Sequence, residues 1–121
     1  MDVVDGFMDN GIIVVKFKEK KFDLDAAKVT VAKRLEVSKG SPYPILIDAS
    51  EVQSISKEAR DYFASPEGIS LIQASALLLT SVMAKFLGNF FLTINKPKVP
   101  TKIFTSGDDA MQWLQQYKRK K

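Results

Sequence analysis

The chain has 121 residues, a formal net charge of +4 and 45% apolar side chains, but it contains neither histidine nor cysteine. Its length and composition are those of one ordinary globular domain, and no apolar run reaches the roughly 18 to 20 residues that span a bilayer. The missing residue types exclude imidazole bases, thiolate nucleophiles, zinc-finger ligand sets and disulfide frameworks. We therefore expect a domain without metal or cofactor.

The positive charge is concentrated at the C-terminus, in Lys118-Arg119-Lys120-Lys121. Without these four residues the chain has 14 basic and 14 acidic side chains. We expect a neutral single domain over residues 1–117 and a solvated basic tail over 118–121, with no nucleic-acid partner. The N-terminus is acidic where a secretory signal would be basic, so we expect a cytoplasmic protein without a transmembrane segment.

The first third of the chain predicts a hairpin followed by a helix. Asp9-Asn10-Gly11 favours a tight turn between strands over 3–8 and 12–17, because Asn and Gly tolerate positive φ angles. Asp23 is a suitable N-cap for a helix that stops at Gly40. A buried strand is predicted from Tyr43 to Ile47, since this short apolar run lies between a proline and polar residues.

The remaining chain alternates between helix and strand. Ser56 predicts the start of a helix over 57–63, and Ser65-Pro66 predicts a new helix start. Ala74 to Thr80 is predicted as a buried strand, although periodicity leaves one continuous helix over 69–79 open. A helix over 83–94, a strand over 101–104 and a last helix capped by Ser106 follow. The apolar face of that last helix, which we expect to lie in the core, consists of Ala110, Trp113, Leu114 and Tyr117.

The resulting order is ββαβαβαβα, which predicts the α/β class and a mostly parallel sheet with an N-terminal antiparallel hairpin strand. Several segments of the chain resemble a STAS-like domain, the fold of bacterial anti-sigma-factor antagonists and of sulfate-transporter cytoplasmic tails. The resemblance is to a SpoIIAA-like group of STAS-like proteins of bacteria. It is carried by Tyr43-Pro44-Ile45-Leu46-Ile47-Asp48, Ala59-Arg60-Asp61-Tyr62-Phe63, Gly88-Asn89-Phe90-Phe91, Asn95-Lys96-Pro97 and Pro100-Thr101-Lys102-Ile103-Phe104, with Ala110 and Trp113-Leu114.

The resemblance implies a phosphorylatable serine at the start of the helix after the third strand. Ser56 is the closest positional match and Ser54 the next, but the acidic residue and the glycine of the family segment are missing here. Lys57 and Arg60 could hold an anion near the helix N-terminus. The alternative is that Ser56 only caps the helix, a role that contributes about 1 kcal/mol.

Catalysis is not expected. Asp48, Ser50 and Glu51 follow a strand's carboxyl end, the usual place of chemistry in parallel sheets, but no imidazole is present to activate the serine. Glycine-rich phosphate loops are absent from the sequence. Asp48 has the simpler interpretation of a strand-end residue whose side chain caps the following turn.

The helix predicted over 83–94 is apolar around most of its circumference. Phe86, Phe90 and Phe91 belong to an arc wider than the stripe of a one-sided helix, with Phe91 on its outer side. The arc can be buried within the domain, form a homodimer interface or line a pocket for an apolar ligand.

Two functions stay open at this point. The first is a non-catalytic regulatory domain that binds a protein partner or a second copy of itself, as the resemblance to anti-sigma-factor antagonists implies. The second is a carrier or sensor of a small ligand, either a lipid or a nucleotide, with a cavity lined by Phe86, Phe90, Phe91 and Trp113.

Overall fold

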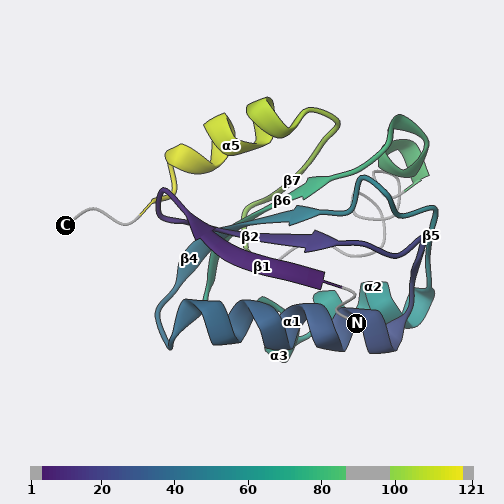
Figure 1. The fold of residues 1–121 in the computed structure, drawn as a ribbon, viewed down its shortest axis with the longest axis horizontal. Helices are drawn as coiled ribbons and strands as arrows, with labels where there is room; N and C mark the ends of the chain where they lie inside the picture. Colours follow the sequence, from purple (N-terminus) through teal and green to yellow (C-terminus); the bar gives the residue numbers. More distant parts are fainter. Residues whose placement is uncertain (1–3, 87–98, 119–121) are drawn as a thin grey trace.

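The computed structural model describes residues 4–86 and 99–118 (Figure 1). A five-stranded sheet with the order β1-β2-β4-β6-β7 forms its centre. Only β1 is antiparallel to its neighbour, and the other strands pair in parallel, so the predicted mixed sheet is confirmed. The strands are β1 (Val4–Asp9), β2 (Ile12–Phe17), β4 (Tyr43–Asp48), β6 (Ile72–Leu78) and β7 (Thr101–Phe104).

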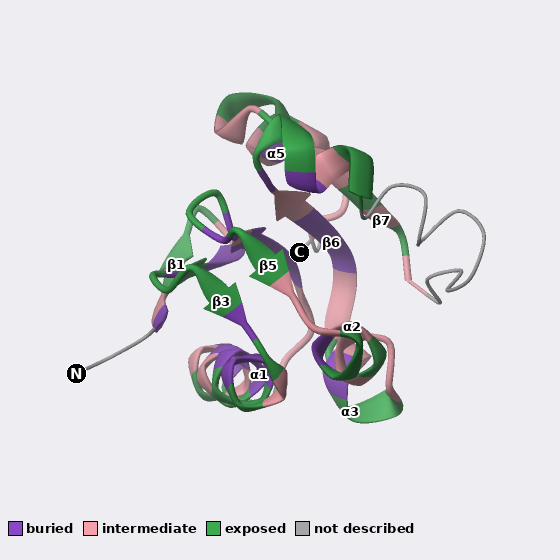
Figure 2. Cartoon of the chain, turned by 90° about the vertical axis from the view of Figure 1, so that its right-hand side faces the viewer, coloured by how far each residue is buried: buried purple, intermediate pink, exposed green. Residues whose placement is uncertain are grey.

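The helices lie on both sides of this sheet (Figure 2). On one side lie α1 (Leu24–Ser38), α2 (Lys57–Phe63) and α3 (Pro66–Ile69), and on the other lies α5 (Gly107–Gln115). Residues 81–86 are also helical. Within the described ranges, no helix has the length and apolar character needed to cross a bilayer.

The turns and helix starts predicted from single residues are confirmed. Asn10 and Gly11 have φ angles of 52° and 80°, as a two-residue hairpin turn requires. Asp23 caps α1, since its carboxylate accepts a hydrogen bond from the Ala26 N–H at 2.9 Å. At the other end of α1, Lys39 and Gly40 adopt positive φ angles of 51° and 83°, which ends the helix in the left-handed region.

The predicted break between α2 and α3 is also confirmed. Ser65 caps α3, and its hydroxyl accepts a hydrogen bond from the Gly68 N–H at 3.1 Å. A side chain at Gly68 would collide with the Tyr62 carbonyl oxygen, so only glycine lets α3 fold back against α2. The chain then continues as β6, which pairs with β4 and β7, so residues 69–79 do not form one continuous helix.

The two faces of the sheet bury different side chains. Because successive strand residues point to opposite faces, the apolar runs of β2 and β4 contribute to both cores. The core beneath α1 and α2 includes Phe17 and Phe22, whose rings lie 4.4 Å apart in an edge contact. The core beneath α5 is formed by smaller or aliphatic residues, namely Ile12, Val14, Leu46, Ala74, Ala76, Ala110 and Leu114.

Several features differ from the sequence-based expectation. A second, two-stranded parallel sheet joins β3 (Lys21–Phe22) to β5 (Ser54–Ile55), and neither strand was predicted. Trp113, expected in the core beside Leu114, is only half-buried and contacts the rings of Phe104 and Tyr117. The reason is position on α5: Leu114 points at the sheet and is fully buried, whereas Trp113 lies on the flank of the helix.

The helix expected over 83–94 begins two residues earlier, at Ser81. Its N-cap is Thr80, whose hydroxyl accepts a hydrogen bond from the Met83 N–H at 3.2 Å. Met83 is buried in the core beneath α1 and α2, whereas Phe86 is 53% exposed. Phe90 and Phe91 lie outside the described residues, so the outward position predicted for Phe91 stays a prediction.

Candidate functional site

An open groove of about 550 Å³ lies at the carboxyl ends of β2, β4 and β6. We call it the carboxyl-end groove. In parallel α/β sheets this edge is the usual place of ligand binding, because the loops that leave the strands converge there. Its lining consists of Lys18, Lys20, Ser50, Glu51, Val52, Gln53, Thr80, Val82 and Met83.

The two-stranded sheet of β3 and β5 holds residues 50–56 in the wall of the groove. The Gln53 N–H donates to the Lys20 carbonyl at 2.7 Å, and the Ser56 N–H donates to the Phe22 carbonyl at 3.0 Å. Phe22 in turn stacks on Phe63 of α2, with ring centroids 5.2 Å apart. These contacts fix the loop after β4 and the start of α2 against the loop after β2.

The groove carries charges of both signs. Lys18 forms an ion pair with Asp5 at 2.9 Å, and both side chains are largely solvent-exposed. Lys20 and Glu51 also line this groove. Exposed ion pairs contribute little to stability, so these charges are more important for what the groove attracts than for the fold.

Two large apolar side chains are exposed on the helical segment 81–86, and the first of them, Val82, lines the carboxyl-end groove. Val82 is 76% exposed and Phe86 is 53% exposed, and they lie one helical turn apart on residues 81–86. The Arg60 guanidinium lies over the Phe86 ring, 5.2 Å from its centroid. This cation–π contact links the helical segment 81–86 to α2.

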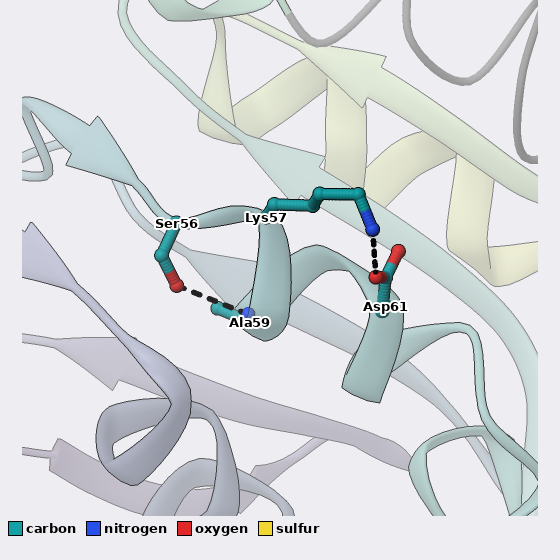
Figure 3. Close-up of polar contacts among 4 residues, drawn as sticks. All are labelled: Ser56, Lys57, Ala59 and Asp61. Atoms are coloured by element: carbon teal, nitrogen blue, oxygen red, sulfur yellow. Dashed lines mark hydrogen bonds and ion pairs between the residues drawn. The ribbon is translucent and has the colours of Figure 1, made fainter.

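The anion site predicted around Ser56 stays a prediction, and in the described geometry its residues make other contacts (Figure 3). The Ser56 hydroxyl accepts a hydrogen bond from the Ala59 N–H at 3.1 Å and therefore caps α2, as the simpler interpretation expected. Lys57 extends away from Ser56 to the Asp61 carboxylate at 2.7 Å, and this hydrogen bond raises the pKa of the lysine. Arg60 contacts Phe86. Lys57 and Arg60 thus both contact residues other than Ser56.

Ser54 lies in a different setting from Ser56. It is exposed on β5, and its register partner across the small sheet is Lys21. Directly opposite residues of neighbouring strands point to the same face of the sheet, so Lys21 and Ser54 share one face. Phosphorylation of Ser54 or Ser56 stays a prediction.

The acidic residues after β4 act locally. The Asp48 carboxylate accepts two hydrogen bonds from Ser50, from its N–H at 3.1 Å and from its hydroxyl at 2.7 Å. This is the turn-capping arrangement that the sequence predicted for Asp48. The hydroxyl of Ser50 is thus directed to a carboxylate within an exposed turn.

The ligand cavity predicted from Phe86, Phe90, Phe91 and Trp113 stays a prediction, because Phe90 and Phe91 lie outside the described residues. The two described members, Phe86 and Trp113, do not lie together. Phe86 contacts α2 on one side of the sheet, whereas Trp113 packs with Phe104 and Tyr117 on the other. A small apolar pocket beneath α2, between Phe22 and Phe63, has a volume of about 30 Å³. That space suits about one water molecule, whereas ligand pockets usually measure roughly 300 to 1,000 Å³.

Two residues that sequence reasoning missed are Val82 and Arg34. Val82 precedes Phe86 by four positions, a spacing that could have identified a shared helix face. Arg34 is buried in α1 and donates to the carbonyls of Ser70 at 2.7 Å and Gly68 at 3.2 Å. Burial lowers the pKa of Arg34 to about 10, so it stays charged at neutral pH and anchors the chain after α3.

Comparison with known proteins confirms the fold. A solved structure from Shewanella loihica PV-4, an uncharacterised protein of the DUF3478 family with a SpoIIAA-like fold, aligns with a TM-score of 0.62. The alignment covers 92% of this chain and 91% of that chain at 16% sequence identity, and at this identity it shows the fold alone. The predicted STAS-like architecture is thus confirmed. A comparison with curated proteins finds no match.

The sequence model of one protein family matches residues 7–118, from β1 to the end of α5. The match includes the carboxyl-end groove and the exposed pair Val82 and Phe86. The chain therefore belongs to the family described as a domain of unknown function, DUF7793.

Proposed function

We propose that this chain is a non-catalytic, regulatory protein-interaction domain whose docking surface is the carboxyl-end groove together with Val82 and Phe86. The observation that carries the proposal is the exposure of these two apolar side chains, 76% and 53%, on a helical segment whose Val82 lines an open groove. Apolar side chains that gather on an exposed surface often mark interaction sites. The STAS-like fold is compatible with this role.

The chemistry of the groove supports binding over catalysis. Its hydroxyl groups come from Ser50 and Thr80. The Ser50 hydroxyl donates a hydrogen bond to the Asp48 carboxylate, and the Thr80 hydroxyl accepts one from the Met83 N–H. The whole sequence contains no histidine or cysteine that could activate a nucleophile there.

The partner that fits this surface carries apolar side chains flanked by carboxylates. The apolar groups would cover Val82 and Phe86, and a carboxylate would meet Lys20 at the groove. Such a partner segment would bury a small apolar centre inside a polar rim, the common anatomy of transient interfaces.

Site-specific photo-crosslinking in the native host tests the proposal. A benzophenone amino acid placed at Phe86 should form an adduct of defined mass, because this position is exposed one helical turn from Val82, which lines the groove. The matched control carries the same probe at Val29, which is 44% exposed on α1. We expect no such adduct from position 29.

A second variant distinguishes specific binding from non-specific binding. Val82→Lys should abolish the adduct formed at position 86, since an uncompensated charge opposes burial of this surface. The fold should be unaffected, because substitutions at exposed sites usually change stability by less than about 0.5 kcal/mol. Equal adducts from positions 86 and 29, or an adduct that survives Val82→Lys, would contradict the proposal.

A further inference from the structure

The strand β1 is an edge strand, with β2 as its only neighbour in the sheet among the described residues. Edge strands are usually protected by charged side chains, especially lysine, by proline or by a bulge, because their free backbone groups can pair with another chain. The charged residues of β1 are Asp5 and Asp9, and Asp5 forms an ion pair with Lys18. Residues 4–9 contain no lysine or proline, and β1 pairs with β2 without a shift in register. Phe7 and Met8 on this strand are 49% and 41% exposed.

From this edge we infer that two copies of the chain associate through antiparallel pairing of their β1 strands about a two-fold axis. Asn10 and Gly11 form a two-residue turn, so Asp9 and Ile12 are the hydrogen-bonded pair that closes the hairpin. The alternation along the ladder then directs the backbone groups of Val4, Gly6 and Met8 to the open side. These are the groups that pair with the second copy.

The charges of Asp5 and Asp9 decide the register in which the two β1 strands pair. A two-fold axis at Phe7 would place Asp5 opposite Asp9 of the second copy, and like charges directly opposite each other are unfavourable. An axis at Gly6 instead places Val4 opposite Met8 of the second copy and Asp5 opposite Phe7. It also places the two Phe7 side chains diagonally across the strand pair, a separation at which aromatic rings can contact each other.

The position of α1 explains why a second copy fits this edge. The helix packs against both β1 and β2 and runs alongside β1 (Figure 1). Neighbouring strands are about 4.8 Å apart, so pairing at β1 would place the two α1 helices about 10 Å apart. Helices that pack against each other have axes about 8 to 10 Å apart. The continuous sheet would thus be covered by two α1 helices in direct contact.

The side chains of α1 near the axis are complementary in charge. A side chain at Gly6 would lie 2.7 Å from Cγ of Lys33 and 3.5 Å from Cγ2 of Val37, so the axis passes close to this part of α1. An antiparallel second α1 then presents Glu36 to Lys33, and the pairing occurs twice by symmetry. Within one chain these two residues already interact at 3.5 Å.

Sedimentation velocity of the full chain tests the inference. We expect the wild type to be a dimer at about 100 µM, and Met8→Lys to weaken association about 100-fold, because a charge would enter an apolar contact. Met8 is partly exposed, so circular dichroism should show an unchanged fold. The matched control is Val82→Lys, on the carboxyl-end groove, which should leave the dimer intact.

Charge reversal tests the register. Lys33→Glu alone should weaken the dimer about tenfold, and Lys33→Glu combined with Glu36→Lys should restore it. A wild type that is monomeric at about 100 µM would overturn the inference. So would a dimer that tolerates Met8→Lys but is split by Val82→Lys, since the interface would then lie at the groove.

Discussion

The two faces of the central sheet are covered to very different extents. On one face α1, α2 and α3 bury a core that includes Phe17 and Phe22 (Figure 2). On the other, α5 packs over β4, β6 and β7, above Ala74 and Ala76. The small residues let α5 approach the sheet closely, but α5 does not extend over β1, so Phe7 stays half exposed. The face covered by α1, α2 and α3 stabilises the fold. The face covered by α5 leaves the edge strand β1 open for contacts.

The largest expected effect lies in the well-covered face. Phe17→Ala should lower the free energy of unfolding by about 3 to 5 kcal/mol, since it removes a fully buried ring and leaves a cavity between β2 and Phe22. Denaturant titration measures the loss. Phe7→Ala, on the same sheet but exposed, is the matched control and should cost less than about 1 kcal/mol. Equal losses would contradict the difference between the faces.

Arg34 gives the next effect on the same face. Arg34→Ala should cost about 3 kcal/mol, because the carbonyls of Gly68 and Ser70 lose charged donors inside the protein. Arg34→Met retains much of the side-chain volume but not the donors, so it isolates the hydrogen-bond contribution. If Arg34→Met were as stable as the wild type, the hydrogen bonds to the end of α3 would have no net effect.

On the face beneath α5, Leu114→Ala should cost about 2 to 4 kcal/mol, since Leu114 is fully buried. Trp113→Ala should cost about 2 kcal/mol, less than a fully buried tryptophan, because its ring is only half-buried between Phe104 and Tyr117. Thermal unfolding of both variants checks this order. A larger loss at Trp113 than at Leu114 would show that the aromatic contacts dominate the docking of α5.

The smallest effects come from one helix cap on each face. Ser56→Ala and Ser106→Ala should each cost about 1 kcal/mol, because each hydroxyl accepts a hydrogen bond from a backbone N–H of the first turn. The control is Ser54→Ala on β5, which should change stability by less than about 0.5 kcal/mol. A loss at Ser54 as large as at Ser56 would contradict the assignment of Ser56 as the cap.

The candidate site was predictable only in part. Ser56 was expected to cap α2 and Asp48 to cap a turn, and both are confirmed because such contacts join residues two or three positions apart. The anion site required Lys57 and Arg60 of α2 to converge near Ser56, the N-cap of the same helix, and the cavity required side chains from separate elements. Lys57 instead reaches Asp61, Arg60 reaches Phe86, and Phe86 and Trp113 lie on different sides of the sheet.

By itself the sequence determined the order of the five central strands and the helices, the hairpin turn at Asn10-Gly11 and the starts of the helices at Asp23, Ser56 and Ser65. These features depend on local backbone preferences and on the period of apolar residues, which a linear pattern contains. The tertiary structure alone decided the pairing of β3 with β5, the burial of Arg34 and the exposure of Val82. Two-residue strands have no periodicity, and burial depends on which distant element covers a residue, so neither can be derived from neighbours along the chain.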